Sequence, residues 1–400
     1  MFIIFIAFVV VLLVVLCLLI LSYFDMKFLV SLALACIASI ATSQPVNDDE
    51  SLRLVSVFFR HGARTPELKD TYPNDPYKLD TFQPMGWGQL TNHGKRMAFT
   101  LGKSLRTRYH DFLGDIYIPE AIRTQTTDYD RTKMSALLLL AGLYPPAPIQ
   151  KWHEELNWLP IPIQYDNEKH DHTMQRPNSY CPNYKNELDQ QLQSDETLEY
   201  LKAHKNTFQY IANHTGKPIN KLSDVFQIYQ TLTAEKTMNL TLPEWTAKVY
   251  PEEITRIAAK QCEIENGNDL MKRLFGGRML GKVIDNMVAK TEGSLHPHER
   301  KIFIYSGHEY SVINILAVLD LYETHFPNYS AAVIIELHYL RSRQDYAVKV
   351  LHVKDVFQEP IELTLANCDV LCPLNEFVTL TAKHVPKNYT AECGSPVNLD

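Results

Sequence analysis

Hydrophobic residues recur with two different periods along this chain, and the two periods predict strands and helices in different places. Met97, Leu101 and Leu105 share one face of a predicted helix. Residues 134–140 predict a second, buried helix, which ends at Tyr-Pro-Pro (144–146). Short apolar runs rich in β-branched residues are typical of strands. Such runs cover 54–59, 116–118, 301–305, 332–337 and 346–353.

The middle of the chain differs from both ends. Between 151 and 287 strand alternation is scarce, and helix-like stretches such as 194–213 dominate. The sequence therefore predicts an α/β fold whose core is built from 44–150 and 288–400, with a C-terminal tail, and whose segment 151–287 forms a mainly helical cap.

The first 43 residues are typical of a targeting region rather than of a folded domain. A complete signal peptide begins at Met26: one positive charge at Lys27, an apolar core over 28–40, and small residues up to Ser43. Residues 2–21 are almost purely apolar and long enough to span a bilayer, so a transmembrane anchor stays open as the rival interpretation. Cleavage after Ser43 predicts a mature chain without a stable membrane anchor.

Composition narrows the class of protein. With 46% hydrophobic and 21% charged residues, the chain is typical of a globular protein. A formal charge of -7 provides no basic surface for nucleic acid. Because no Cys/His spacing typical of a metal site occurs, we expect no metal.

The secretory route permits disulfides, which changes the interpretation of the cysteines. Five remain after the targeting region, so at least one is free or bonded to another chain. Cys368 and Cys372 can close a local ring, which leaves Cys181 to pair with Cys393 and Cys262 as the odd thiol. Four sequons fit a secreted glycoprotein: Asn213, Asn239, Asn328 and Asn388.

The most informative motif follows the first predicted strand and reads Arg60-His61-Gly62-Ala63-Arg64-Thr65-Pro66. Side chains at the carboxyl ends of strands point into the crevice where α/β proteins bind ligands. Two guanidinium groups can bind a phosphoryl group through bidentate hydrogen bonds, and His61 would then lie next to the phosphorus atom. The alternative is that both arginines form surface ion pairs and His61 packs at a turn.

A third arginine stands at the start of the second predicted helix. Thr127 or Asp128 is the expected N-cap, so Arg131 falls in the first turn. A positive charge there opposes the helix dipole, and a nearby bound anion would explain it. The alternative is an exposed Arg131 paired with Asp128 or Asp130.

A second strand end carries titratable groups, Ser306-Gly307-His308-Glu309. Alone, such a pair is typical of a polar turn. Together with the distant Arg-His-Gly motif it supplies a second imidazole and a carboxyl group, which phosphoryl transfer through a histidine requires.

These motifs, in this order, resemble the histidine acid phosphatase family of secreted, lysosomal, prostatic and venom enzymes. Gly-Trp-Gly-Gln-Leu-Thr at 86–91, Thr-Asp-Tyr-Asp-Arg-Thr at 127–132 and the Cys-Asp-Val-Leu-Cys-Pro loop at 368–373 extend the resemblance over nearly the whole mature chain. It implies a phosphoglycerate mutase-like three-layer α/β core with a helical cap. It also implies a covalent phosphohistidine, no metal or organic cofactor, and a possible homodimer.

Carried over by motif, the resemblance makes His61 the nucleophile and Arg60, Arg64 and Arg131 the ligands of the phosphoryl oxygens. His308 would donate from the opposite side, and Glu309 would be the proton donor. Glu309 departs from the family, where most members carry aspartate, and Gln125 stands where mammalian members carry arginine. The expected activity is hydrolysis of small phosphate monoesters at acidic pH by a secreted or lysosomal protein.

Other functions stay open at this stage. The glutamate could mark a secreted binding protein that has lost catalysis, and the same scaffold serves phytases and lipid-phosphate phosphatases. A phosphoglycerate mutase shares the Arg-His-Gly start but is cytosolic, which disagrees with the signal peptide and sequons. The natural substrate, the start codon and the oligomeric state are not determined by the sequence.

Overall fold

A computed structural model describes residues 50–399 of the chain. The predicted signal peptide and the alternative anchor at 2–21 lie outside the described residues. Within 50–399, none of the helices combines the length and the apolar character needed to cross a membrane.

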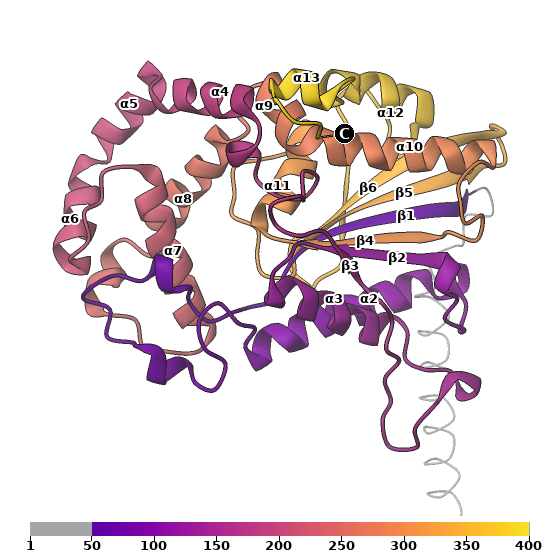
Figure 1. Ribbon diagram of the computed structural model, residues 1–400, viewed down its shortest axis with the longest axis horizontal. Coiled ribbons are helices and arrows are strands. Elements are labelled where there is room, and N and C mark those ends of the chain that lie inside the picture. Colours follow the sequence, from indigo (N-terminus) through magenta and orange to yellow (C-terminus); the bar gives the residue numbers. More distant parts are fainter. Residues whose placement is uncertain (1–49, 400) are drawn as a thin grey trace, which may run out of the picture. The chain divides into compact units, whose positions relative to one another are not determined.

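One mixed sheet forms the centre of the described part of the chain (Figure 1). Its strand order is β3-β2-β4-β1-β5-β6-β7, and β8 also pairs with β6. β4 pairs in parallel with both β1 and β2, whereas β6 runs antiparallel to β5, β7 and β8. The carboxyl ends of β1, β2 and β4 therefore meet at one edge. The strands are β1 Glu50–Arg60, β2 Ile122–Thr126, β3 Gln164–Tyr165, β4 Ile302–Gly307, β5 Ala332–Leu340, β6 Asp345–Val353, β7 Ile361–Leu363 and β8 Cys372–Pro373.

Helices cover both faces of this sheet, which confirms the predicted three-layer α/β core (Figure 1). Strand side chains alternate between faces. Val57 of β1 packs with α2 (Asn92–Leu113) and α3 (Asp130–Leu143), while the next residue, Phe58, packs with helices of the opposite face. Those helices are α10 Arg278–Glu292, α11 Glu309–Val318 and α12 Leu374–Thr381.

A separate group of helices carries its own apolar core, centred on residues such as Ile228, Leu232 and Ile257. The stretch 194–213 is helical, as predicted, and it forms two helices that meet at His204, whose backbone leaves the regular helical path. The division of the chain at 150 and 287 stays a prediction. The helices of this group are α4 Pro182–Leu192, α5 Asp195–Ala203, α6 Lys205–Thr215, α7 Leu222–Thr237, α8 Glu252–Ile264 and α9 Asp269–Lys272.

Short elements connect these layers. The π-helical turn η7 (Arg273–Gly277) leads into α10, and the five-residue helix α13 (Tyr389–Cys393) lies near the end of the chain. The 3-10 turns are η1 Leu68–Asp70, η2 Leu79–Phe82, η3 Pro119–Ala121, η4 Pro148–Gln150, η5 Pro177–Ser179, η6 Glu244–Lys248 and η8 Ala382–His384.

Four of the five predicted strands coincide with β1, β4, β5 and β6, but the strand predicted at 116–118 is wrong. Ile116 and Ile118 are each 41% exposed, and the strand lies at 122–126 instead. That strand reads Ile-Arg-Thr-Gln-Thr, so its burial comes from its neighbours β3 and β4 rather than from its own apolar residues. The N-cap of α3 is Tyr129, not Thr127 or Asp128, although Arg131 does lie in the first turn.

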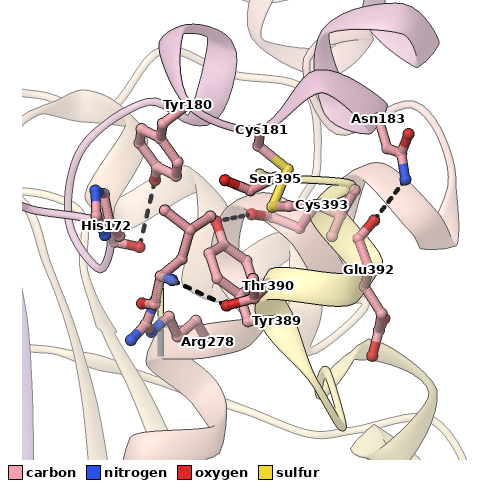
Figure 2. The surroundings of a disulfide bond; sticks show 12 residues. His172, Tyr180, Cys181, Asn183, Arg278, Tyr389, Thr390, Glu392, Cys393 and Ser395 are labelled. Atoms are coloured by element: carbon pink, nitrogen blue, oxygen red, sulfur yellow. Dashed lines mark hydrogen bonds between the residues drawn. A yellow bond between two sulfur atoms is a disulfide. The ribbon is translucent and has the colours of Figure 1, made fainter. Parts of the chain in front are cut away.

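Two disulfides bear out the predicted pairing, Cys181 with Cys393 and Cys368 with Cys372, and Cys262 is a buried free thiol. Figure 2 shows the first of them, which joins the start of α4 to α13 across 212 positions of sequence. Beside it, the amide of Asn183 donates a 2.9 Å hydrogen bond to the carbonyl of Glu392.

Candidate active site

The two histidine motifs meet because β4 lies between β1 and β2. Arg60 stands opposite Gly307 in the β1–β4 register, and the backbone N–H of His61 donates to the carbonyl of Gly307 at 2.9 Å. On the other side, the N–H of Thr127 donates to the carbonyl of Ser306 at 3.2 Å. The rings of His61 and His308 consequently stand edge to face, with centroids 5.5 Å apart.

A cavity of about 480 Å³ opens above these strand ends. Of the six side chains predicted from the motifs, five line it: His61, Arg64, Arg131, His308 and Glu309. Arg60 lies behind them, 1% exposed. Its Nη1 donates to the carbonyl of Pro327 at 2.7 Å, and its guanidinium carbon lies 4.1 Å from the centre of the Tyr329 ring. Arg60 therefore acts on the cavity chiefly through its charge.

His61 has a defined tautomer. Its Nδ1 lies 2.8 Å from the carbonyl oxygen of Gly62, which can only accept, so Nδ1 carries the proton and Nε2 keeps its lone pair. Burial, followed by the charges of Arg131 and Arg60, lowers the pKa of His61 well below 6.5. The ring is therefore neutral even in mildly acidic solution.

His308 is neutral for the same reasons, because burial and then Arg131 lower its pKa well below 6.5. Its Nδ1 lies 3.4 Å from Nη2 of Arg131, and since a guanidinium only donates, Nδ1 is the acceptor. Nε2 then carries the proton and donates to Oγ1 of Thr127 at 3.0 Å. The ring stacks on Tyr310 at a centroid distance of 5.0 Å.

The arginines of the cavity already face carboxylates. Nη2 of Arg131 lies 3.0 Å from Oε1 of Glu67, and Nη2 of Arg64 lies 3.7 Å from the same oxygen and 3.6 Å from Oδ2 of Asp70. The partner of Arg131 is thus Glu67, whereas Asp128 pairs with Lys133. Within residues 50–399, the buried Nε atoms of Arg60, Arg64 and Arg131 have no hydrogen-bond partner. Arg64 and Arg131, which line the cavity, therefore each carry a buried donor without a hydrogen-bond partner.

Glu309 is the first residue of α11, where the helix dipole favours a negative charge. Its Oε2 lies 3.5 Å from Nε of Arg60. Burial raises the pKa of Glu309, but Arg60 and Arg176 outweigh burial, and the pKa falls below its usual value. The carboxyl group is therefore ionised in the structure as it stands.

Gln230 of α7 holds Glu309 from the side of the helical group. Its Nε2 donates to Oε1 of Glu309 at 3.3 Å, while its own Oε1 accepts from Nη2 of Arg60 at 3.4 Å and of Arg64 at 3.5 Å. In the opposite orientation, the NH2 group of Gln230 would face the guanidinium donors and its oxygen would face the Glu309 carboxylate. The orientation of the amide is therefore determined.

Sequence reasoning missed Glu67, Gln230 and Arg176. Glu67 directly follows the Arg-His-Gly motif, so its position along the chain was a usable signal. Gln230 stands between the buried residues Ile228 and Leu232, and a polar residue within an apolar stretch was the only sign of its role. Arg176 comes from a loop before η5 and carries no pattern.

Two groups in the described part of the chain have the spacing of metal ligands, and neither lines the cavity. Two members of the first, Cys368 and Cys372, form a disulfide with each other. The carboxylates of the second, Asp269 and Asp320, pair with lysines. Neither group supplies a ligand to the candidate site.

Fold and site together define a histidine phosphatase. Residues 51–353 match the family model described as Histidine phosphatase superfamily (branch 2), and the chain belongs to this family. Among curated relatives, it is 38% identical over 344 residues to "Venom acid phosphatase Acph-1" of Apis mellifera, covering 86% of this chain and 87% of that one. It is 33% identical over 357 residues to the lysosomal acid phosphatase of Homo sapiens, covering 87% and 82%.

Solved structures agree on the fold. The phytase of Klebsiella sp. ASR1 superimposes with a TM-score of 0.66 at 15% sequence identity, over 88% of this chain and 99% of that one. The phytase of Citrobacter braakii gives a TM-score of 0.65, also at 15% identity, over 86% and 99%.

Proposed function

We propose that this protein is an acid phosphatase that hydrolyses phosphate monoesters through a covalent phosphohistidine on His61. The proposal rests above all on the environment of His61, a neutral ring held among three arginines. An exposed histidine, with a pKa near 6.5, is mostly protonated at pH 5 and cannot attack phosphorus. Burial among arginines removes that obstacle and at the same time attracts the phosphate.

The first step forms the bond between Nε2 of His61 and phosphorus and breaks the ester P–O bond. Phosphoryl transfer has a loose transition state with charge on the equatorial oxygens, so positive groups around it lower the barrier. Arg64 and Arg131 supply donors from the cavity wall, and His308 faces His61 from the neighbouring strand end. Direct contact of Arg60 with the phosphoryl group stays a prediction, because its side chain lies behind the cavity.

Glu309 is proposed to protonate the leaving alkoxide and then to take a proton from the water that attacks the phosphohistidine. The second step breaks the P–N bond, releases phosphate and restores His61. Because Arg60 and Arg176 keep Glu309 ionised, it must gain a proton when substrate binds. A phosphate dianion in the cavity raises the pKa of a nearby carboxyl group, which favours that uptake at acidic pH.

A direct test traps the intermediate. Protein incubated at pH 5 with a ³²P-labelled aryl phosphate and quenched in alkali, in which phosphohistidine survives, should carry label at His61. His61→Ala should lose the label and nearly all turnover. Turnover that persists in His61→Ala would overturn the mechanism. No turnover by folded wild-type protein that still binds phosphate would favour the alternative of a binding protein.

Secretion and glycosylation are a second part of the proposal. The four sequon asparagines, Asn213, Asn239, Asn328 and Asn388, are all exposed. The two disulfides suit an oxidising compartment. A shift in mass of the secreted protein after treatment with an N-glycosidase would support this part, and an unchanged mass would contradict it. The homodimer stays a prediction.

A further inference from the structure

Glu67 is a carboxylate built into the wall of the proposed phosphate site. Its Oε1 faces both Arg131 and Arg64, at 3.0 and 3.7 Å from their Nη2 atoms, and its Oε2 lies 3.0 Å from Nζ of Lys69. The side chain is 17% exposed and borders the cavity. A carboxylate oxygen therefore lies beside the guanidinium groups that would hold a phosphoryl group.

Backbone hydrogen bonds hold the two residues that precede Glu67. The N–H of Gly88 donates to the carbonyl of Pro66 at 2.8 Å, and the N–H of Thr65 donates to the carbonyl of Gln89 at 2.9 Å. Gly88 has φ of +69°, and a Cβ atom there would lie 3.2 Å from Cγ of Glu67. A larger residue at position 88 would crowd the Glu67 side chain, so the glycine leaves room for it beside Arg131.

Glu67 remains charged in this position. Burial raises its pKa, but Arg64, Arg131 and Lys69 together outweigh burial, and the pKa falls below its ordinary value. The rest of the wall also carries charges of both signs. Four basic residues border the cavity, Arg64, Lys69, Arg131 and Arg176, and so do four acidic ones, Glu67, Asp70, Glu168 and Glu309. Burial raises the pKa of Asp70 to about 6, so at more acidic pH this carboxyl group is largely protonated and the acidic residues offset the basic ones only in part.

We propose that Glu67 is a specificity-determining residue that selects phosphate monoesters whose leaving group is neutral or cationic near the phosphorus, and disfavours substrates with a second anionic group there. The proposal rests on the phosphatase function proposed above and adds its substrate class. A second phosphate or carboxylate would meet the charge of Glu67 just where Arg131 and Arg64 could otherwise have bound it. An ammonium or hydroxyl group would instead find an acceptor.

The size of the effect follows from Coulomb's law. For two charges about 6 Å apart at a partly screened cavity mouth, repulsion corresponds to a change of roughly threefold to tenfold in kcat/KM. Attraction of a cationic group should change kcat/KM by a similar factor in the opposite direction.

Three matched substrates test the proposal: phenyl phosphate, 3-carboxyphenyl phosphate and 3-(ammoniomethyl)phenyl phosphate at pH 5.5. Each substrate is assayed with wild type, Glu67→Gln and Glu67→Lys, and the ratio of variant to wild-type kcat/KM cancels differences between leaving groups. The matched control is Glu168→Gln, which removes a carboxylate from the same cavity that bonds the Tyr129 hydroxyl rather than an arginine.

For Glu67→Gln, the ratio of variant to wild-type kcat/KM should be threefold to tenfold higher with 3-carboxyphenyl phosphate than with phenyl phosphate. With the ammonium substrate, this ratio should be lower than with phenyl phosphate. Glu67→Lys should shift both ratios further, while Glu168→Gln should shift them less. An equal change for all three substrates would mean that Glu67 only restrains Arg131, and would overturn the inference. If folded wild type hydrolyses none of the three, the proposed phosphatase function itself fails, which is a separate outcome.

Discussion

Buried histidines among arginines are the main feature of this protein at the scale of single residues. His61 and His308 are 1% and 4% exposed, and the charges around them keep both rings neutral. Neutrality gives His61 its lone pair, but it also means that His308 offers only the one proton that it now donates to Thr127. The proposed mechanism therefore assigns acid catalysis to Glu309.

Glu309→Gln tests that role through the leaving group. With an alkyl phosphate, whose alkoxide needs a proton, we expect kcat to fall about 100- to 10,000-fold. With 4-nitrophenyl phosphate, whose phenolate leaves unaided, we expect a rapid burst of nitrophenol followed by slow turnover, because only breakdown of the phosphohistidine still needs a base. Stopped-flow absorbance measures the burst.

Glu309→Asp is the matched control, since it keeps the carboxyl group and shortens the side chain by one methylene. It should retain a larger share of alkyl phosphate turnover than Glu309→Gln does. Equal losses for both substrates in Glu309→Gln, with no burst, would show that Glu309 acts through its charge and not as a proton donor.

At the scale of secondary-structure elements, the loop that carries the Arg-His-Gly motif is clamped against the start of α2. An ideal Cβ atom on Gly62 would lie 2.2 Å from the carbonyl oxygen of Gly94, and one on Gly94 would lie 1.9 Å from the carbonyl oxygen of Ala63. Two backbones therefore touch at this point, and the contact fixes the loop that presents His61.

Gly94→Ala should consequently destabilise the protein and misplace His61. Overpacking at a site without room costs about 1–3 kcal/mol or more. Urea denaturation should show the lower free energy of unfolding, and kcat should fall in the fraction that stays folded. Gly281→Ala in α10 is the control, because its Cβ would meet only a methyl group of Val385 at 3.2 Å. Equal stability of the two variants would contradict the backbone clamp.

Glu235 of helix α7 and Asp75 form a buried pair of carboxyl groups, and neither residue lines the cavity. Glu235 is 0% exposed and lies near Asp75, a 3% exposed residue of the loop between η1 and η2. Within residues 50–399, neither oxygen of Glu235 has a hydrogen-bond partner, and two ionised carboxyl groups buried near each other would repel, so one of them holds a proton. Burial and then Asp75 raise the pKa of Glu235. The hydroxyls of Tyr72 and Tyr250 and the charge of Lys78 also act on this pair.

The raised pKa makes stability depend on pH with a definite sign. Above about pH 4.3 the unfolded chain releases the Glu235 proton while the folded protein retains it, so stability falls as pH rises, by up to about 1.4 kcal/mol per pH unit. Glu235→Gln should remove that slope. Urea unfolding between pH 5 and pH 8 measures this slope. The free energy of unfolding of the variant, relative to that of wild type, should be greater at pH 8 than at pH 5. The exposed residue Glu244, changed to Gln, serves as control, and a slope unchanged in Glu235→Gln would refute the shared proton.

On the scale of the whole molecule, the two disulfides differ in the length of chain that they close. Cys181–Cys393 spans 212 positions and ties α4 to α13, as Figure 2 shows, whereas Cys368–Cys372 spans 4. A cross-link restricts the unfolded chain more when it closes a longer loop. The long link should therefore matter more for stability.

Replacing both cysteines of each pair with serine measures the difference. On the loop-entropy estimate, Cys181→Ser/Cys393→Ser should cost about 5 kcal/mol of unfolding free energy, and Cys368→Ser/Cys372→Ser about 2 kcal/mol. Denaturant midpoints under non-reducing conditions give both values. If Cys368→Ser/Cys372→Ser is less stable than Cys181→Ser/Cys393→Ser, the predicted order of the two disulfides is contradicted.

The sequence located the core of the proposed site better than its surroundings. Five of the predicted residues line one cavity, namely His61, Arg64, Arg131, His308 and Glu309. The sequence could identify them because each lies in a local motif at a strand end or a helix start. The strand β2 was placed wrongly, since its polar residues are buried only by neighbouring strands. Glu67 as the partner of Arg131 and Gln230 as the partner of Glu309 depend on contacts that no local pattern records.

The sequence by itself determined the α/β fold class, the cysteine pairs and the types of residue that can do phosphoryl chemistry, because these depend on periodicity, spacing and side-chain composition. Only the tertiary structure decided which groups are charged. The pKa of His61, the ionisation of Glu309 and the presence of a carboxylate beside Arg131 all arise from burial and from charges brought together by distant segments. Electrostatic energy depends on distance and solvent access, which the order of residues does not specify.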